Sequence, residues 1–356
     1  MTTLWDPIQV GAMTLPHRMA MAPMTRSRAK PNGVPGDLAA EYYAQRASLG
    51  LLITEGVQPS EDGQGYLTTP GIHTEAQAAV WRRVTAAVHA RGGRVFMQLM
   101  HVGRMSHPDN TPHHRQPVGP SVVAPGQQMF TAAGLQDIPV PRALSIQEIA
   151  DTVADFRRAA RMAVEAGADG VEIHGANGYL LQQFFAPNAN HRDDAYGGAI
   201  ENRIRFAVEV VNAVADEIGP ERTAIRLSPG VSLGGLEEGP EGPSLYRRLV
   251  EALAPLHLAY LHLMHAGDED LLTDIRQTWP TTLMVLRLGR TLETLDQDLR
   301  SGAADMVSIG RWALANPDFV ERLRQGAPLN DPDPSTFYGG GATGYTDYPG
   351  LLRAAA

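Results

Sequence analysis

Short apolar runs alternate with longer amphipathic stretches along this chain, and that alternation restricts the fold more than any other property of the sequence. The apolar runs cover residues 19–22, 51–56, 95–99, 170–174, 224–227, 260–263, 283–288 and 305–309. Such runs, separated by helical segments, are typical of parallel strands with both faces covered. Eight β/α units with right-handed crossovers close on themselves, so the pattern predicts an α/β fold, a single (β/α)8 TIM barrel.

Helical periodicity fills the segments between the apolar runs. The clearest helices are expected at residues 75–91, 145–166 and 200–218. The second opens with a capping box, in which Ser145 and Glu148 would each satisfy the other's backbone N–H. A glycine follows each helix where a left-handed cap ends it: Gly92, Gly167 and Gly219.

Two segments break the alternation, at residues 100–144 and 326–356. Neither is long enough to form a domain. We therefore expect one domain over residues 1–356, with an N-terminal lid and with these two segments capping the active-site end of the barrel.

Composition excludes several classes of function. The net charge is −9 and no cluster of Lys or Arg occurs, which argues against nucleic-acid binding. The first residues lack the pattern of a signal peptide, and no apolar run reaches the roughly 18 residues of a membrane span, so a cytoplasmic enzyme is expected. The chain has no cysteine, which excludes disulfides, iron–sulfur clusters and a cysteine nucleophile.

Polar and glycine residues gather where the predicted strands end, and in a barrel these ends share the rim that carries the active site. Gly289-Arg290 and Gly310-Arg311 follow the seventh and eighth strands. Loops at these two places bind phosphate in many barrels, through backbone N–H groups that glycine leaves accessible. The two dipeptides therefore predict a phosphate site, to which each Arg would add a charged fork.

The fourth and fifth strands predict an inward-facing polar cluster. Alternation points Glu172, His174 and Arg226 into the barrel, and we expect Glu172 and Arg226 to share a network because a buried carboxylate needs a partner. His174 and Asn177 offer N–H donors that could hold one developing oxyanion, and Tyr179 is a weak acid that could deliver a proton. No second ligand stands beside His174 at metal-site spacing, so no metal is expected.

At these residues the chain resembles a known family. It is similar over essentially its whole length to the Old Yellow Enzyme family of FMN-dependent ene-reductases. The resemblance is carried by MAPMTRSRA (21–29), EYYAQRAS (41–48), LLITEGVQ (51–58), FMQLMHVGR (96–104), VEIHGANGYLLQQFFAPNANHRDDAYGG (171–198), ENR (201–203), IRLSP (225–229), SIGRWALANPD (308–318) and FYGGGATGYTDYP (337–349).

The resemblance implies tightly bound, non-covalent FMN at the top of the barrel, reduced by NADPH or NADH. It places the following residues around FMN: Pro23, Met24, Thr25, Gly56, Gln98 and Arg226 at the ring, and Gly289, Gly310 and Arg311 at the phosphate. His174 and Asn177 would hold the oxygen of an enone, enal, maleimide or nitroalkene. FMN N5 would then pass hydride to the β-carbon while Tyr179 protonates the α-carbon. Other substrate-lining positions are Tyr66, Met100 and Tyr338.

Three features depart from the family pattern. Met100 stands where many relatives carry Trp, which predicts a roomier pocket. The loop at residues 264–270 is short, and Arg287 replaces a small residue before the phosphate glycine, so Arg311 is the stronger phosphate candidate. Thr25 places the chain in the Thr-type branch, which implies a monomer or homodimer.

Two other functions remain open from the residues. A flavin-free barrel aldolase or isomerase acting on a phosphate substrate would need a catalytic Lys on an inner strand, and the chain has only Lys30, in a loop. A non-catalytic FMN-binding protein would not need Tyr179.

Overall fold

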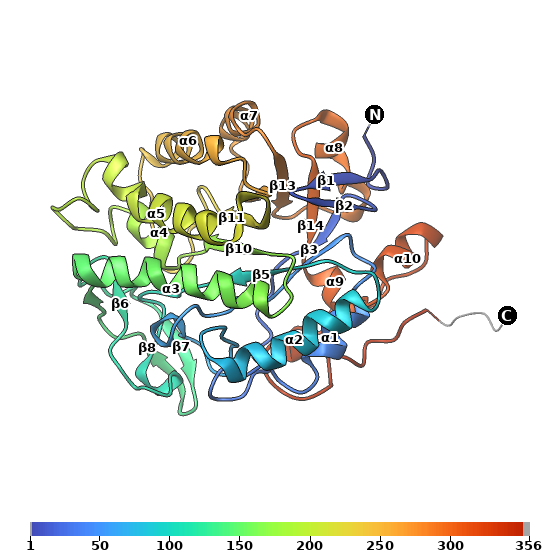
Figure 1. The fold of residues 1–356 in the computed structure, drawn as a ribbon, viewed down its shortest axis with the longest axis horizontal. Coiled ribbons are helices and arrows are strands. Elements are labelled where there is room, and N and C mark those ends of the chain that lie inside the picture. Colours follow the sequence, from blue (N-terminus) through green and yellow to red (C-terminus); the bar gives the residue numbers. More distant parts are fainter. Residues whose placement is uncertain (1, 352–356) are drawn as a thin grey trace.

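The computed structural model describes residues 2–351, which form a closed barrel of eight parallel strands (Figure 1). The strands are β3 (Met19–Met21), β4 (Leu51–Ile53), β5 (Val95–Leu99), β10 (Gly170–Gly175), β11 (Thr223–Leu227), β12 (Tyr260–His265), β13 (Thr282–Arg287) and β14 (Met306–Ile309). Each pairs with the next in the chain, and β14 closes the ring on β3, with Val307 opposite Met19. The predicted barrel is confirmed, and no strand end differs from its prediction by more than three residues. Residues 352–356 of the predicted capping segment lie outside the described residues.

Helices follow the strands and surround the barrel. They are α1 (Ala39–Gln45), α2 (Glu75–His89), α3 (Ile146–Glu165), α4 (Leu180–Phe185), α5 (Ile200–Ile218), α6 (Gly242–Leu253), α7 (Glu269–Thr278), α8 (Gln297–Ser301), α9 (Arg311–Ala315) and α10 (Phe319–Gln325). The predicted capping box is present, since Ser145 Oγ accepts from the Glu148 N–H and Glu148 Oε2 accepts from the Ser145 N–H. The three predicted cap glycines all have φ between +77° and +90°.

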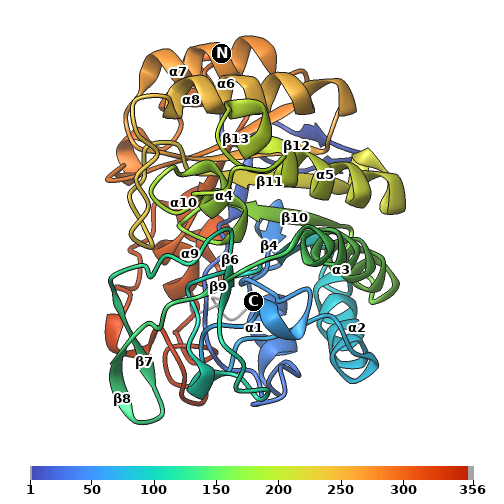
Figure 2. The ribbon, with the colours of Figure 1, turned by 90° about the vertical axis from the view of Figure 1, so that its left-hand side faces the viewer.

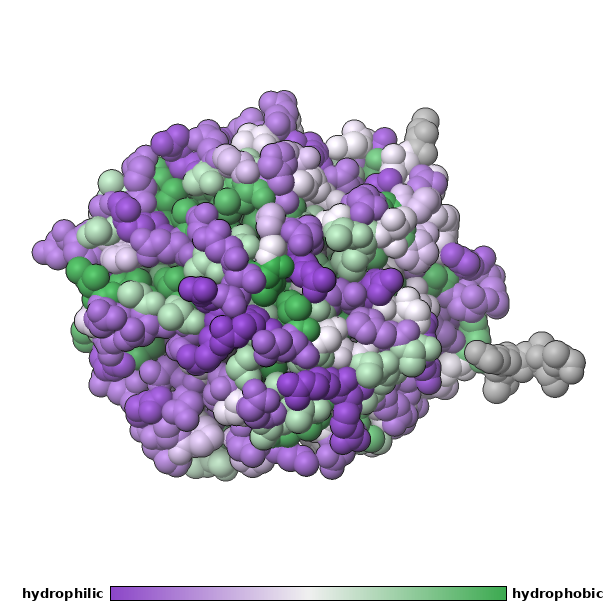
Figure 3. Space-filling model, in the orientation of Figure 1, coloured by the Kyte–Doolittle hydropathy of each residue, from purple (hydrophilic) through white to green (hydrophobic). Residues whose placement is uncertain are grey.

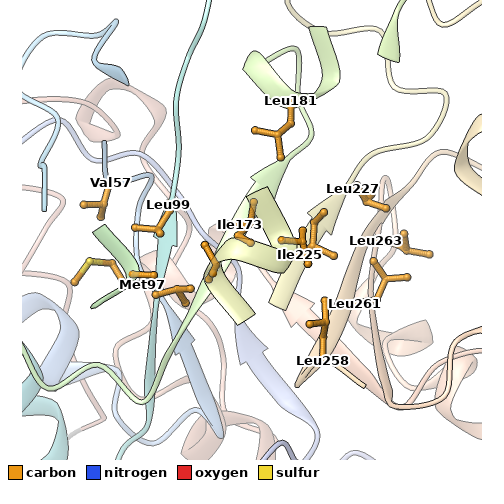
Figure 4. Packing of buried hydrophobic residues seen from close by; sticks show 14 of the residues in the cluster. Val57, Met97, Leu99, Ile173, Leu181, Ile225, Leu227, Leu258, Leu261 and Leu263 are labelled. Carbon is orange, nitrogen blue, oxygen red and sulfur yellow. The ribbon is translucent and has the colours of Figure 1, made fainter. Parts of the chain in front are cut away.

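Strand residues alternate between two hydrophobic layers. Ile173, Ile225 and Leu261 point outward and pack beneath the helices (Figure 4). Inside the barrel, Leu51, Phe96 and other apolar residues fill the half nearer the amino ends of the strands. The hairpin of β1 (Ile8–Val10) and β2 (Met13–Leu15) packs its buried side chains against this inner cluster. Apolar residues thus close one end of the barrel and leave the polar strand ends at the other.

The excursion at 100–144 contains β6 (Val118–Gly119) and β9 (Arg142–Ala143), which pair with each other, and the hairpin of β7 (Gln128–Thr131) and β8 (Gly134–Asp137). Figure 2 shows this hairpin projecting from the body of the molecule. Its Met129 packs in a cluster with Met100, to which Tyr66 and Tyr179 also contribute. The excursion therefore packs against Tyr66 and Tyr179, which lie outside it.

The C-terminal segment is held against the same end of the barrel by two arginines. Arg26 donates to the carbonyl oxygens of Phe337 and Gly344, at 3.0 and 2.8 Å. Arg28 donates to those of Gly341 and Thr343, at 3.1 Å each. These bonds fix the backbone on both sides of the glycine-rich stretch 339–341.

The face drawn in Figure 3 is largely hydrophilic, with apolar residues scattered among the polar ones. Among the described residues, no helix combines the length and the apolar character needed to cross a bilayer.

Candidate active site at the carboxyl ends of the strands

A cavity of about 350 Å³ opens where β3, β11 and β14 end, and we call it the inner cavity. Its walls contain six of the residues predicted to bind FMN and one predicted to line the substrate pocket. The full lining is Ala22, Pro23, Met24, Thr25, Arg226, Leu286, Gly310, Arg311, Leu314, Phe337 and Tyr338. Ala22, Leu286, Leu314 and Phe337 were not anticipated: Leu286 lies outside the recognised motifs, and the other three lie within them at apolar positions to which no role was given. Tyr338 stands at the edge of this cavity with 68% of its surface exposed.

A second cavity of about 620 Å³, the β13–β14 cavity, adjoins the first and shares Leu286, Gly310 and Arg311 with it. It is lined by the loops that follow the seventh and eighth strands, where a phosphate was predicted. At Gly310 the nearest atom to an added Cβ would be Met24 Sδ, at 3.9 Å, so the backbone is open on that side. Gly289 has φ +75° and has open space around it.

The arginines around the β13–β14 cavity differ in their partners. Arg290 donates to both carboxylate oxygens of buried Asp298, at 2.7 and 3.3 Å. Arg287 also pairs with Asp298, at 2.9 Å, and with Glu269. Arg311 has no ion pair within residues 2–351. The predicted charged fork from Arg290 is therefore already committed to a carboxylate, and Arg311 is the arginine whose charge is available to a phosphate.

The turn after β10 positions the predicted oxygen donors. Asn177 and Gly178 both have positive φ, +58° and +86°. Asn tolerates this conformation, while a side chain at 178 would meet the carbonyl oxygen of Leu233 at 2.6 Å. The turn is fixed by the Asn177 N–H, which donates to Ser228 Oγ at 2.9 Å, and by the Gly178 N–H, which donates to Gln182 Oε1 at 2.7 Å.

Polar atoms of this region are buried without protein partners. Within the described residues, His174 Nδ1, Asn177 Oδ1 and Arg226 Nε make no hydrogen bond. His174 lies opposite Arg226 in the register of β10 and β11. Burial, with a smaller effect from the charge of Arg226, lowers the pKa of His174 well below its usual value, so the imidazole is neutral near pH 7. Buried polar groups are normally satisfied, so these atoms mark a place for a polar ligand.

Tyr179 stands beside this group, and its ring meets the His174 ring edge-on at 5.1 Å between centroids. The Tyr179 hydroxyl donates to the Tyr66 hydroxyl at 3.1 Å. Burial raises the pKa of Tyr179 well above its usual value, so the phenol keeps its proton. Met100 is 3% exposed and packs against Gly56, where an added Cβ would lie 2.5 Å from Met100 Sδ. The thioether thus fills the space over Gly56, and the predicted roomier pocket stays a hypothesis.

Glu172 has other direct partners than the expected one. Its carboxylate accepts from Gln98 Nε2 at 2.8 Å and contacts His262 Nδ1 at 2.9 Å, while Arg226 acts on it through charge. His262 Nε2 lies 2.8 Å from Ser308 Oγ. His262 and Ser308 were not anticipated, although polar residues at inward positions of β12 and β14 were a readable signal. Lys30, by contrast, pairs with Asp37 in an exposed loop, away from the inner strands.

The residues present fit an FMN molecule. Glycine backbone and Arg311 at the β13–β14 cavity suit a phosphate, and the inner cavity between Pro23, Arg226 and Tyr338 suits a flat ring with polar edges. Neither cavity includes His174 or Asn177. His174 lies opposite the cavity residue Arg226 in the strand register, and the Asn177 N–H donates to Ser228 Oγ in the segment that follows β11. The geometry thus brings the predicted residues of β3, β10, β11 and β14 to one end of the barrel.

Comparison with known proteins supports this interpretation. Residues 3–330 match the model of the NADH:flavin oxidoreductase / NADH oxidase family. The chain is 42% identical to 12-oxophytodienoate reductase 2 of Arabidopsis thaliana, over 99% of this chain and 96% of that protein. It is 41% identical to a probable flavin mononucleotide-dependent alkene reductase of Leishmania infantum, over 96% of each.

Solved structures agree with the sequence matches. Morphinone reductase in complex with tetrahydroNAD superposes with a TM-score of 0.94 and 45% identity, over 99% of this chain and 98% of that one. The Old Yellow Enzyme homologue from Zymomonas mobilis gives 0.93 and 41%, over 98% and 100%. The chain therefore belongs to the NADH:flavin oxidoreductase / NADH oxidase family, as an FMN-dependent ene-reductase of the Old Yellow Enzyme type that uses NAD(P)H.

Proposed function

We propose that this enzyme reduces the C=C bond of α,β-unsaturated carbonyl or nitro compounds, with His174 and Asn177 binding the activating oxygen and Tyr179 supplying the proton. The observation that carries the proposal is the group of buried, unpartnered polar atoms on His174 and Asn177 beside a protonated phenol. A substrate oxygen would accept from the unpaired Nδ1–H of His174 and from the side-chain NH2 of Asn177, whose Oδ1 is itself an acceptor and would need a donor from elsewhere.

FMN would be held by Pro23, Met24, Thr25, Gly56, Gln98 and Arg226 around the ring and by Gly289, Gly310 and Arg311 at the phosphate. When bound, it supplies the hydride that it first receives from NADPH or NADH. The fixed charge of Arg226 favours the reduced, more negative form of such a ring. The absence of a side chain at Gly56 leaves room for the Met100 thioether, which packs where a Cβ would lie.

The protein groups act on the substrate in two ways. Donors on His174 and Asn177 stabilise the negative charge that grows on the substrate oxygen, and because both are fixed by β10 and its turn, little reorganisation is required. Tyr179 then donates its proton to the α-carbon as the enolate forms. The Tyr66 hydroxyl accepts the Tyr179 hydrogen bond and orients that phenol, while Met100 and Tyr338 bound the substrate space.

The proposal extends to the setting of the enzyme. We infer small-molecule activated alkenes as substrates, a cytoplasmic location, and a monomer or homodimer. The excursion 100–144 and the C-terminal segment would cap the active-site end of a single domain, in keeping with the contacts of the first to Tyr66 and Tyr179 and of the second to Arg26.

Anaerobic spectroscopy tests the proposal directly. The purified protein should be yellow, lose its flavin absorbance on addition of NADPH or NADH, and recover it when 2-cyclohexenone is added, with cyclohexanone as product. A colourless protein would favour a flavin-free aldolase or isomerase. A yellow protein that neither bleaches nor turns over would favour a non-catalytic FMN-binding protein.

A further inference from the structure

A chain of four buried polar side chains crosses the barrel interior next to Arg226. Glu172 on β10 lies at its centre and is 0% exposed, bonded to Gln98 of β5 on one side and to His262 of β12 on the other. His262 continues the chain to Ser308 of β14. Leucine, phenylalanine and methionine fill the neighbouring layer of the same interior, so packing does not require polar residues here.

The carboxylate is the negative charge of this group. Burial alone would raise the pKa of Glu172, but His262, Arg226 and the Gln98 hydrogen bond outweigh burial and lower it below the usual value. Burial lowers the pKa of His262, so its imidazole is neutral, donating from Nδ1 to Glu172 and accepting at Nε2 from Ser308. In this part of the interior, Glu172 then carries the negative charge and Arg226 the positive charge.

Both neighbours of Glu172 reach toward the proposed flavin. Arg226 lies between His174 and His262 in the strand register and lines the inner cavity. Gln98 lies opposite Glu172 in the register of β5 and β10. Since Nε2 of Gln98 is held by the carboxylate, its Oε1 is the amide atom left to accept a hydrogen bond from a ligand. Glu172 thus offsets the charge of Arg226 and fixes the orientation of the Gln98 amide, although it lines neither cavity itself.

We propose that Glu172 is a positioning residue that lowers the reduction potential of bound FMN, by offsetting the positive charge of Arg226 and by fixing the amide of Gln98. Reduction adds negative charge to the flavin, and a buried carboxylate opposes that addition in a medium of low dielectric constant. The inference rests on the proposed FMN site and adds to it a residue that the FMN does not touch.

The test compares two charge-removing variants on the same stretch of chain. Glu172→Gln keeps the size of the side chain and one acceptor oxygen for Gln98 but removes the charge. Asp169→Asn removes an equal charge one residue before β10, at the amino end of the barrel, where Asp169 pairs with His89 and Arg94. The midpoint potential of FMN in each holoenzyme is measured anaerobically against reference dyes.

Glu172→Gln should raise the midpoint potential by at least about 30 mV, which is a tenfold change in the equilibrium constant of a two-electron couple, while Asp169→Asn leaves it at the parent value. An unchanged or lowered potential in Glu172→Gln, or equal rises in both variants, would overturn the inference. Should Glu172→Gln fail to fold, Glu172→Met removes the charge with a side chain of similar length, and a parent-like potential in that variant would overturn the inference in the same way. A parent protein that binds no FMN would overturn the proposed function itself. That outcome is distinct from a bound flavin whose midpoint potential does not change when Glu172 is replaced.

Discussion

Replacing Tyr179 with Phe isolates the proposed proton donor. The change removes one oxygen from a buried ring and keeps the contacts of that ring with His174 and with the Met100 cluster. A positioned general acid contributes about 10²–10⁴-fold to the rate. Because the Tyr66 hydroxyl lies 3.1 Å from the oxygen that is removed, it can hold a water in its place. We therefore expect the smaller loss, about 10²-fold or about 2.7 kcal/mol of transition-state stabilisation.

Stopped-flow absorbance measures the two half-reactions separately. The rate at which NADPH bleaches the Tyr179→Phe enzyme should equal the parent rate, because no proton is delivered to a carbon in that step. The rate at which 2-cyclohexenone restores the flavin absorbance should fall by about 10²-fold. Tyr66→Phe is the matched control, since it loses the same hydrogen bond but retains the acid, and it should lose less than about tenfold. Parent-like reoxidation of Tyr179→Phe would refute the assignment, as would equal losses in the two variants.

Three further predictions concern two residues of the site and one buried carboxylate outside it. His174→Ala should lower kcat/KM for cyclohexenone by about 10²-fold in steady-state assays, because Asn177 alone would then hold the oxygen; a change under threefold would contradict the oxyanion role. Arg311→Ala should raise the FMN dissociation constant of the apoprotein by about 10–100-fold in fluorescence titrations, through loss of a charged hydrogen bond; parent-like binding would move the phosphate elsewhere. Burial raises the pKa of Glu55 to about 7, against the opposing backbone N–H of Arg26, so its neutral form is favoured in the folded protein. The free energy of unfolding should then fall by about 3 kcal/mol as the pH rises from below 4.5 to above 7, and Glu55→Gln should abolish this decrease in thermal melts; a parent protein whose stability rises over that range would show the sign to be wrong.

The barrel and much of its rim could be read from the residues in order. Alternation within a strand places Ile173 outside and His174 inside without knowledge of any other strand, and the Ser145–Glu148 cap depends on four consecutive residues. The long family motifs likewise predicted which strand ends would carry the proposed site. Contacts between residues close in the chain, and features repeated along it, depend on the local sequence alone. They were therefore predictable.

The hydrogen-bond and ion-pair partners of residues on different strands were not predictable. They depend on which strands lie side by side in the closed barrel and on the length of each side chain. Glu172 could have paired with Arg226, yet the register sets it opposite Gln98 and within reach of His262. Arg290 was expected at a phosphate, yet Asp298, eight residues on, holds its guanidinium. A buried charge pairs with the nearest well-oriented group that can balance it. Which side chains from different strands lie near one another is decided only when the chain closes into a barrel.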